Sequence, residues 1–302
     1  MAKRGRKKEA RRLLPLKSDI VFKIVFGDYR NSDILRAFLI AALDIPEEEY
    51  DAIEILDPHL ERDYPDDKLG VLDVRIRTKL GKLINVEIQL HEFSFMPERI
   101  TFYACRNLTT QISPGQSYDE VQKTISIVIL GYDLIQNSPS YHHRFRLYDA
   151  GNGVLFTDAI EINCLELKKL PDAESPDAKE EQLLNWLRLI RAEREEEFDM
   201  LETKTPEMRK TVGILKKLSA DERTRMLYED RERARMDELA KMRGSYSKGR
   251  EEGREEGREE GRQEERVEVA QNMLSMGIDP ETVAKASGLA LEKIQELAER
   301  TQ

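Results

Sequence analysis

Apolar residues between Lys17 and Leu43 recur three and four positions apart, with interruptions at Gly27 and Asn31. This spacing places apolar side chains along one face of a helix, and each interruption is a point at which a helix can end. Two successive helices are therefore predicted in this stretch.

From Ala52 to Leu90 the pattern changes to an alternation of apolar and polar residues. A period of two is that of a β-strand whose opposite faces meet different environments. The alternation occurs three times, around Ile55, over residues 72–76 and over residues 86–90. Three strands are predicted here.

Helical spacing returns between Pro97 and Ile112, and the β-branched run from Thr124 to Leu130 is typical of a buried strand. A further pair of strands is predicted at Arg144 to Tyr148 and at Ala159 to Leu167. Two helices, three strands, a helix and then strands again indicate an α/β fold over the first half of the chain.

Beyond residue 170 the chain becomes strongly charged and helical in pattern. Residues 171–240 are predicted to be a helical extension, and residues 241–265 repeat the motif Gly-Arg-Glu-Glu. The repeat has too few apolar side chains for a core, and each interior glycine costs about 1 kcal/mol of helix stability. A charged, partly helical linker is the favoured interpretation; alternatively, the glycines let two such helices approach closely in an oligomer. The predicted domains are completed by a basic disordered tail (1–14), a core (15–170) and a small helical unit (266–302).

The last unit contains the signals of three short helices. Gly277 and Gly288 are placed to end helices, and Asp279 followed by Pro280 is placed to begin one. The stretch from Thr282 to Leu297 resembles a helix-turn-helix. A helix that reads a DNA groove is normally basic, whereas the last helix here holds three glutamates against one lysine and one arginine. Packing or dimerisation is therefore favoured over DNA reading for this unit.

Charge is unevenly distributed along the 302 residues, of which 36% are charged, with a net charge of −10. Residues 1–12 hold seven Lys or Arg against one Glu, a charge of +6, which leaves −16 for the remaining 290 residues. A solvated tail is the favoured interpretation of such a segment. It can also contact phosphates without sequence specificity.

The two cysteines, Cys105 and Cys164, are too few for a disulfide scaffold, and no cluster of His or Cys suggests a zinc site. This favours a reducing, cytoplasmic compartment. No apolar run approaches the roughly 20 residues of a membrane-spanning helix. The basic N-terminus is not followed by the apolar segment of a secretory signal, so no membrane partner is expected.

Candidate chemistry is concentrated in a predicted β-hairpin. Lys79–Gly81 can form a three-residue loop in which Gly81 is left-handed. Thr78 then lies opposite Lys82, the numbers of every two opposed residues add up to 160, and Asp73 lies opposite Glu87. Opposed side chains share one face of the sheet with Cβ atoms roughly 5 Å apart. Two carboxylates at this spacing repel each other and suit Mg²⁺ or Mn²⁺. The open alternative is a pair of exposed acids neutralised by neighbouring cations: Arg75, Arg77 or Lys82.

The order of elements, with an acid on the second strand and an acid-x-polar triplet on the third, resembles the PD-(D/E)XK nuclease core. More narrowly, the chain resembles the recombination-promoting nuclease and transposase family of that superfamily. The resemblance implies a restriction-endonuclease-like α/β core of helix, three-stranded antiparallel meander, helix and strand, with a helical C-terminal extension. It runs from about Leu16 to Leu170 and rests on the order and spacing of five segments: Lys17–Gly27, Val71–Val74, Asn85–Gln89, Arg99 with Tyr103, and Leu165–Leu170.

The resemblance also implies roles for individual residues. Asp73 and Glu87 would bind the catalytic metal, Mg²⁺ or Mn²⁺, with the Ile88 carbonyl as a further ligand. Asp19, in the first helix, would be an accessory acid. Gln89 stands where the wider superfamily carries lysine, whereas the narrower family often has glutamine. A glutamine can orient the attacking water but supplies no positive charge.

Three other side chains could supply that charge: Lys17, Lys23 and His91. For His91 an ordinary surface position is the favoured interpretation. Arg99 and Tyr103 lie one turn apart on the following helix, where they either face the scissile phosphate or brace the sheet.

The function implied by the resemblance is a metal-dependent endonuclease that hydrolyses DNA phosphodiester bonds. One alternative is a catalytically weak or inactive nuclease fold that acts as a DNA-binding or oligomerising scaffold, which Gln89 and the acidic net charge favour. A second is an enzyme of the same fold that acts on RNA. A homo-oligomer formed through the C-terminal helical region is also expected.

Overall fold

A computed structural model describes residues 13–57, 73–92 and 94–301. The basic tail up to residue 12, and Leu72 of the predicted second strand, lie outside the described residues. The chain divides into two compact units, Met1–Tyr228 and Glu229–Gln302.

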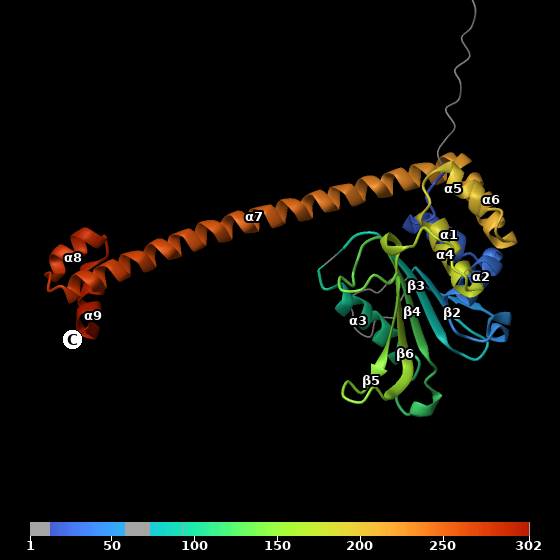
Figure 1. Cartoon of the computed structure of the whole chain (residues 1–302), viewed down its shortest axis with the longest axis horizontal. Helices are drawn as coiled ribbons and strands as arrows, with labels where there is room; N and C mark the ends of the chain where they lie inside the picture. Colours follow the sequence, from blue (N-terminus) through green and yellow to red (C-terminus); the bar gives the residue numbers. More distant parts are fainter. Residues whose placement is uncertain (1–12, 58–72, 93, 302) are drawn as a thin grey trace, which may run out of the picture. The chain divides into compact units, whose positions relative to one another are not determined.

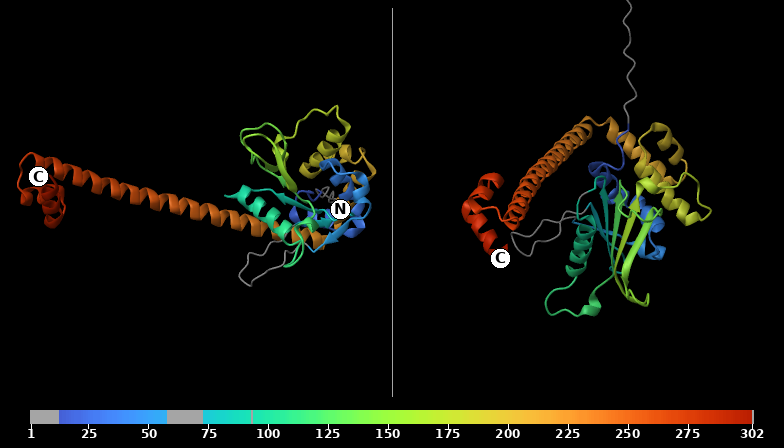
Figure 2. Two further views of the ribbon diagram at one scale, coloured as in Figure 1. Left: turned by 90° about the horizontal axis from the view of Figure 1, so that it is seen from below. Right: turned by 60° about the vertical axis from the view of Figure 1, so that its left-hand side comes forward.

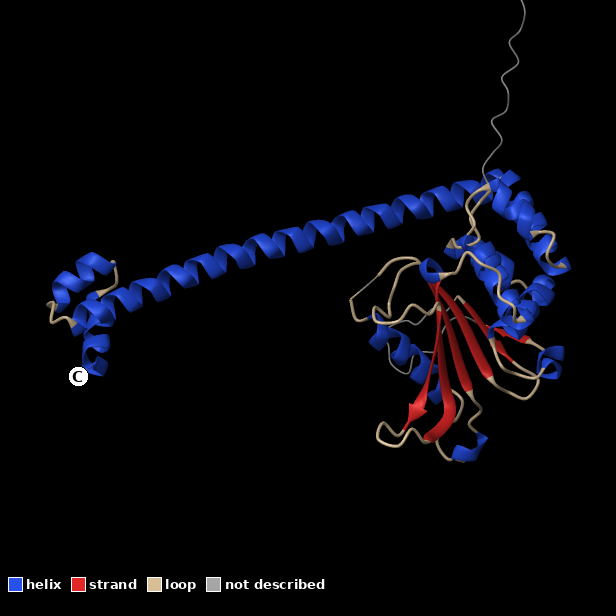
Figure 3. Cartoon of the chain, viewed as in Figure 1, coloured by secondary structure: helices blue, strands red, loops and turns tan. Residues whose placement is uncertain are grey.

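The N-terminal unit is built on one mixed β-sheet (Figure 3). Its strands are β1 (Glu54–Leu56), β2 (Val74–Arg77), β3 (Leu83–Gln89), β4 (Thr124–Leu130), β5 (His142–Tyr148) and β6 (Leu155–Glu166). They lie in the order β1-β2-β3-β4-β6-β5. The first three pair antiparallel, β3, β4 and β6 run parallel, and β5 pairs antiparallel with β6 at the edge. The six predicted strands are confirmed.

Helices cover both faces of this sheet. They are α1 (Asp19–Phe26), α2 (Ser32–Ala42), α3 (Met96–Thr109), α4 (Ala178–Arg191), α5 (Glu195–Leu201) and α6 (Pro206–Ala220). Short 3-10 turns lie at Tyr29–Asn31, Glu47–Asp51, Tyr118–Glu120 and Leu167–Lys169. Figure 1 and the right-hand view of Figure 2 show α3 on one face of the sheet and α1, α2 and α4 on the other.

The hairpin between β2 and β3 has the predicted register, because Val74 pairs with Val86 and Arg77 with Leu83. Gly81 adopts φ +88°, and its N–H donates to the Thr78 carbonyl at 2.9 Å. A left-handed glycine at the end of a three-residue loop sets this register.

The larger core lies between the sheet and the helices of the α1 face. Phe26 and Phe38 pack around Trp186 of α4, with ring centroids 6.1 and 6.2 Å from the indole. Val212 and Leu215 of α6 are buried in the same core. Residues 171–220 thus supply helices to the core of the N-terminal unit, although their pattern predicts only a helical extension. The domain boundaries themselves stay a prediction.

The α3 face has a smaller apolar cluster. Met96 and Ile100 of α3 pack on Val128, Leu130 and Cys164 of the parallel strands. Polar side chains of β3 share this face, because Glu87 is aligned with Val128 and Val128 with Cys164. The side of the sheet that carries Glu87 is therefore the side that α3 covers.

The charged repeat lies within one helix, α7 (Glu222–Ser275). After it come α8 (Pro280–Ser287) and α9 (Leu291–Thr301), as the glycine and Asp-Pro signals predict. The Asp279 side chain accepts a hydrogen bond from the Thr282 N–H at 3.0 Å, and Gly277 and Gly288 adopt positive φ. Four residues form the small buried core of this unit: Ala270, Val283, Ile294 and Leu297. None of the described helices is long and apolar enough to span a membrane.

Candidate active site

The predicted acid pair lies where β2 begins and β3 ends. The register of the hairpin, extended by one residue before Val74, places Asp73 opposite Glu87. Asp73 is held there by the Ile88 N–H, which donates to its Oδ2 at 2.9 Å. The N–H and C=O of one strand residue point to the same side, so the Ile88 carbonyl also faces the Asp73 side of β3.

Glu87 is the more buried of the two acids, with 8% of its surface exposed. The Asn85 side chain donates to its Oε1 at 3.2 Å, and Ser126 of β4 in turn donates to Asn85 Oδ1 at 2.8 Å. Asn85 and Ser126 were not among the predicted site residues. The available signal was two polar residues inside apolar strand runs, at positions that the parallel register pairs.

The electrostatics of the pair disfavour two negative charges. Burial raises the pKa of Asp73 above its ordinary value. Burial, followed by the charge of Asp73, raises the pKa of Glu87 from 4.5 to about 7. Glu87 therefore changes its charge near neutral pH, which is common for carboxylates at functional sites.

Helix α1 supplies charges to this site from its first two turns. Lys23 Nζ lies 3.3 Å from Asp73 Oδ1. Asp19, one turn earlier, accepts a hydrogen bond from the Ile20 N–H at 2.8 Å, and its negative charge acts on Asp73. Residues four apart lie on the same helix face, so Asp19 and Lys23 both lie toward the β2 end of the site.

Of the three candidate donors of positive charge, Lys23 lies beside the acids through its ion pair with Asp73. Lys17 forms an ion pair with Glu193 of the segment before α5. His91 was predicted on the same strand face as Gln89, and this is wrong, because β3 ends at Gln89 and His91 lies in the bend that follows. The strand ends there since its partner β4 ends at the paired residue Leu130.

Gln89 is the last residue of β3 and is half-buried. Its carbonyl accepts a hydrogen bond from the Gly131 N–H at 2.9 Å. Gly131 packs so tightly on Leu90, the residue after β3, that an added Cβ would lie 2.9 Å from the Leu90 carbonyl oxygen and 3.0 Å from Leu90 Cα. The end of β4 therefore fixes the backbone from which the Gln89 side chain projects.

Arg99, the fourth residue of α3, acts on the site from the face that α3 covers. Its guanidinium carbon lies 5.5 Å from the centroid of the Tyr103 ring, and its positive charge acts on Glu87. Arg75, one of the cations proposed to neutralise the acids, donates to Asn107 Oδ1 at 2.8 Å. The pair is thus flanked by Lys23 on one side and by Arg99 on the other.

The donors at this site fit a hard divalent cation. Two carboxylates and a backbone carbonyl are oxygen ligands of the kind that Mg²⁺ and Mn²⁺ prefer. Within residues 13–57, 73–92 and 94–301, no three His, Cys, Asp or Glu side chains are grouped so that they could hold a metal ion. A cation here would therefore take two side-chain ligands, with Asp19 contributing its charge.

Two segments of the chain match known protein families. Residues 16–245 match the family described as PD-(D/E)XK nuclease family transposase. The chain belongs to this family. The PD-(D/E)XK transposase match covers the sheet, the acid pair and helices α1–α6, so the predicted restriction-endonuclease-like core with a helical extension is confirmed.

The C-terminal unit of this PD-(D/E)XK family member has a match of its own. Residues 263–299 match the C-terminal HTH domain of the Rpn/YhgA-like nuclease family. The resemblance of Thr282–Leu297 to a helix-turn-helix is thereby confirmed. An HTH domain supports DNA binding, which the acidic last helix had made the less favoured interpretation. No curated protein and no solved structure matches the chain. Together the two family matches support a nuclease-like function.

Proposed function

We propose that this protein is a divalent-metal-dependent DNA endonuclease. Asp73 and Glu87 would hold the ion, Mg²⁺ or Mn²⁺, with the Ile88 carbonyl as a further ligand. The observation that carries the proposal is the buried Glu87, whose pKa of about 7 reflects burial and the neighbouring Asp73. A cation at this point would offset the repulsion of the two carboxylates, which Lys23 and Arg99 offset only in part.

The bound ion would lower the pKa of a water and neutralise charge that develops on the phosphate oxygens. Gln89 would accept or donate a hydrogen bond to orient the attacking water. Asp19 would add negative charge beside Asp73. The Ile88 N–H holds the Asp73 carboxylate in place, and Asn85 does the same for Glu87.

Lys23 is proposed to take the role of the lysine that Gln89 replaces. Its side chain is 41% exposed, and its Nζ lies 3.3 Å from Asp73 Oδ1, so it can reach both solvent and the acid pair. A cation at this position would contact a phosphate oxygen of bound DNA. Arg99 would contact the phosphate from the α3 side.

A nuclease-fold scaffold with little or no catalysis is the second candidate. The C-terminal HTH match favours it, because this unit would bind DNA without any contribution from the acid pair. Cytoplasmic localisation and homo-oligomerisation through the C-terminal helices stay predictions.

A plasmid nicking assay separates the two candidates. Wild-type protein and the Asp73→Ala variant are incubated with supercoiled DNA, with Mg²⁺ and with excess EDTA. The nuclease proposal requires nicking by the wild type in Mg²⁺ alone and none by Asp73→Ala. Cleavage that persists in EDTA, or equal cleavage by both proteins, would show that the active-site assignment is wrong.

A further inference from the structure

One side of helix α3 carries arginine and aromatic residues at regular spacing. Arg99 is followed three, four and seven positions later by Phe102, Tyr103 and Arg106, so the four residues lie along one side of the helix. We call these four residues the α3 strip. Arginine and aromatic side chains side by side are typical of surfaces that bind nucleic-acid strands.

The side chains of the α3 strip contact one another. The guanidinium carbon of Arg99 lies 5.5 Å from the centroid of the Tyr103 ring. The rings of Tyr103 and Phe102 meet edge to face, with centroids 5.5 Å apart. Arg99 is exposed, and 48% of the surface of Phe102 is exposed. The strip is therefore one continuous surface that presents a guanidinium and an aromatic ring to solvent.

The α3 strip lies on the side of the helix that is nearer the acid pair. Thr110 follows Arg106 by four residues and so continues the same side, and it accepts a hydrogen bond from Arg75 Nη2 of β2 at 3.3 Å. At the other end of the strip, the charge of Arg99 acts on Glu87 of β3. The strip thus follows the β2 and β3 side of α3 and ends beside the proposed metal ligands.

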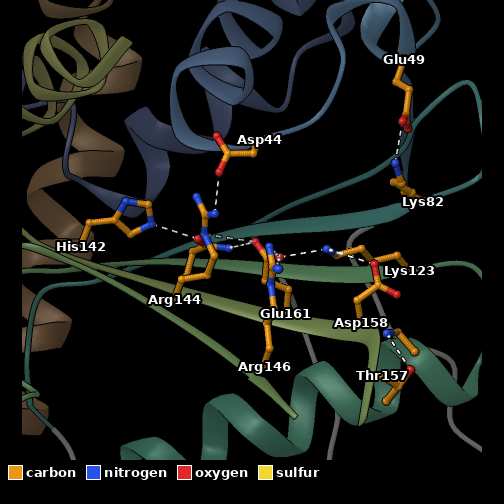
Figure 4. Close-up of polar contacts among 12 residues, drawn as sticks. Asp44, Glu49, Lys82, Lys123, His142, Arg144, Arg146, Thr157, Asp158 and Glu161 are labelled. Carbon is orange, nitrogen blue, oxygen red and sulfur yellow. Dashed lines mark hydrogen bonds and ion pairs between the residues drawn. The ribbon is translucent and has the colours of Figure 1, made fainter. Parts of the chain in front are cut away.

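A second group of basic side chains lies on the opposite face of the sheet. Glu161 is aligned with Ile125 of the larger core, so it lies on the α1 face. It accepts hydrogen bonds from Arg146 Nε at 2.8 Å and from Lys123 Nζ at 2.9 Å, as Figure 4 shows. These cations are engaged by a buried acid and lie away from the acid pair. A DNA strand that reaches the acid pair would therefore meet the α3 strip and not this group.

We propose that the α3 strip binds unpaired bases of the DNA strand whose phosphate lies at the acid pair, so that the substrate is DNA with unpaired bases beside the cut. This inference rests on the proposed endonuclease function. A base inside a duplex is covered on both faces by its neighbours, whereas an unpaired base offers a face to an aromatic ring. Phe102 would supply that ring, and Arg99 would contact the adjoining phosphate. Stacking of this kind depends little on the identity of the base.

The dimensions of the α3 strip fit a nucleotide strand. Phe102 lies three residues beyond Arg99, a rise of about 4.5 Å along the helix, of the same order as the roughly 3.4 Å between successive nucleotides of a B-form strand. One phosphate contact and one stacked base therefore correspond to neighbouring positions on the DNA. A stable protein partner would need roughly 800 Å² on each side, which the partly exposed rings of the strip do not provide.

A further exposed ring lies one turn before Arg99. Phe95 is 77% exposed, and its carbonyl accepts a hydrogen bond from the Arg99 N–H at 3.0 Å. Its φ of 64° lies in the left-handed region, which favours glycine. Strained backbone of this kind occurs often at functional sites. Phe95 can thus offer a second stacking face at the end of the strip that is nearer the start of α3.

Fluorescence anisotropy with two labelled DNAs of the same sequence tests the proposal. One DNA is a full duplex, and the other has a single-stranded gap of about five nucleotides, within the site sizes of surfaces that bind single strands. The full chain carries Asp73→Asn in every binding measurement, so that no DNA is cut. This parent protein should bind the gapped DNA more tightly than the duplex.

Phe102→Ala, added to the parent, should weaken binding to the gapped DNA by about 5- to 100-fold, because one base loses its stacking partner. Binding to the duplex should not change. Phe102→Tyr keeps an aromatic ring and should retain the preference for gapped DNA. Tyr118→Ala is the matched control, because this side chain is 85% exposed in the Tyr118–Glu120 turn outside the strip, and it should bind as the parent does. Fluorescence of Trp186, the single tryptophan, reports that the core stays folded.

Equal binding of the two DNAs by the parent would overturn the proposal, and so would an equal loss for both DNAs in Phe102→Ala. Cleavage of the same DNAs in Mg²⁺ is measured in parallel with the protein that retains Asp73. A protein that prefers gapped DNA through Phe102 but cuts neither DNA would support the base-binding surface and contradict the endonuclease function. Failure of the inference and failure of the proposed function are therefore distinguishable.

Discussion

Glu87 combines two properties that rarely occur together without a ligand, deep burial and a neighbouring acid. Arithmetic on the hairpin loop was enough to pair it with Asp73, because a three-residue loop with one left-handed glycine fixes the register. Its burial and its hydrogen bond from Asn85 could not be predicted, because they depend on which strand and helix cover this face. Local pattern thus predicts which acids meet, whereas tertiary packing sets their pKa.

Glu87→Gln should stabilise the fold in the absence of metal, and more so at high pH. The pKa of Glu87 is about 7 in the folded protein, against its ordinary value of 4.5. The stability that the protonated Glu87 contributes is therefore fully present below pH 4.5 and is lost as the pH rises through about 7. Urea unfolding followed by Trp186 fluorescence should give a gain on the order of 1–3 kcal/mol at pH 8 and a smaller one at pH 5.

Glu49→Gln is the matched control, since Glu49 is equally buried but pairs with Lys82 Nζ at 2.5 Å. Glu49→Gln should destabilise the protein, because the partly buried Lys82 ammonium loses its negatively charged partner. A Glu87→Gln variant that is destabilised to the same degree at both pH values would contradict the description of the site.

Gln89 is expected to affect the rate of cleavage without affecting metal binding. Gln89→Ala should slow cleavage because the attacking water loses its hydrogen bond, and Gln89→Lys should be tolerated or faster because it adds positive charge. Calorimetry with Mn²⁺ should give the wild-type affinity for Gln89→Ala. Loss of the ion as complete as in Glu87→Ala would exclude a role limited to the water.

At the scale of elements, the strands were predictable and the helical layer was not. Alternation and β-branched runs identify strands directly, because a strand meets different environments on its two faces. The apolar stripe of α4 around Trp186 shows that this helix is buried but does not specify its partner, and its packing on Phe26 and Phe38 follows only from the fold. The tight contact of Gly131 with Leu90 is likewise invisible in the pattern.

Gly131→Ala should impair both stability and cleavage. Its Cβ would lie 2.9 Å from the Leu90 carbonyl oxygen, so the ends of β3 and β4 must separate and the backbone of Gln89 must shift. We expect a loss of about 1–3 kcal/mol in urea unfolding and slower plasmid nicking. Gly213 lies in α6, where an added Cβ would meet nothing within 4 Å. Gly213→Ala should therefore raise the free energy of unfolding by up to about 1 kcal/mol and leave cleavage normal. Equal behaviour of the two variants would show that the contact does not support the site.

At the scale of the whole molecule, composition predicted that the chain becomes strongly charged and helical beyond residue 170. It did not predict the length of helix α7. Glycine-rich charged repeats are weak helix formers, yet the repeat forms part of the 54-residue helix α7. The Glu and Arg side chains spaced three apart in the repeat favour this helix. Every proposed ligand of the metal precedes residue 90, so the acid pair needs no residue of α7.

A chain that ends at residue 240 should therefore fold and cut DNA, with altered target affinity because the HTH unit is removed. Light scattering, Trp186 fluorescence and plasmid nicking of the truncated protein check this expectation. An unfolded or insoluble product would mean that the C-terminal residues stabilise the N-terminal unit, contrary to modular organisation.

The claim that Asp73 and Glu87 share one divalent cation is tested most directly by calorimetric titration of Mn²⁺ into the full chain at pH 8. The wild type should bind one ion at the site, Asp73→Asn and Glu87→Gln should each lose it, and the double variant should lose no more than either single variant. Glu54→Gln, which alters an exposed acid on β1, should bind as the wild type does. Wild-type affinity in either Asp73→Asn or Glu87→Gln would contradict the shared metal site.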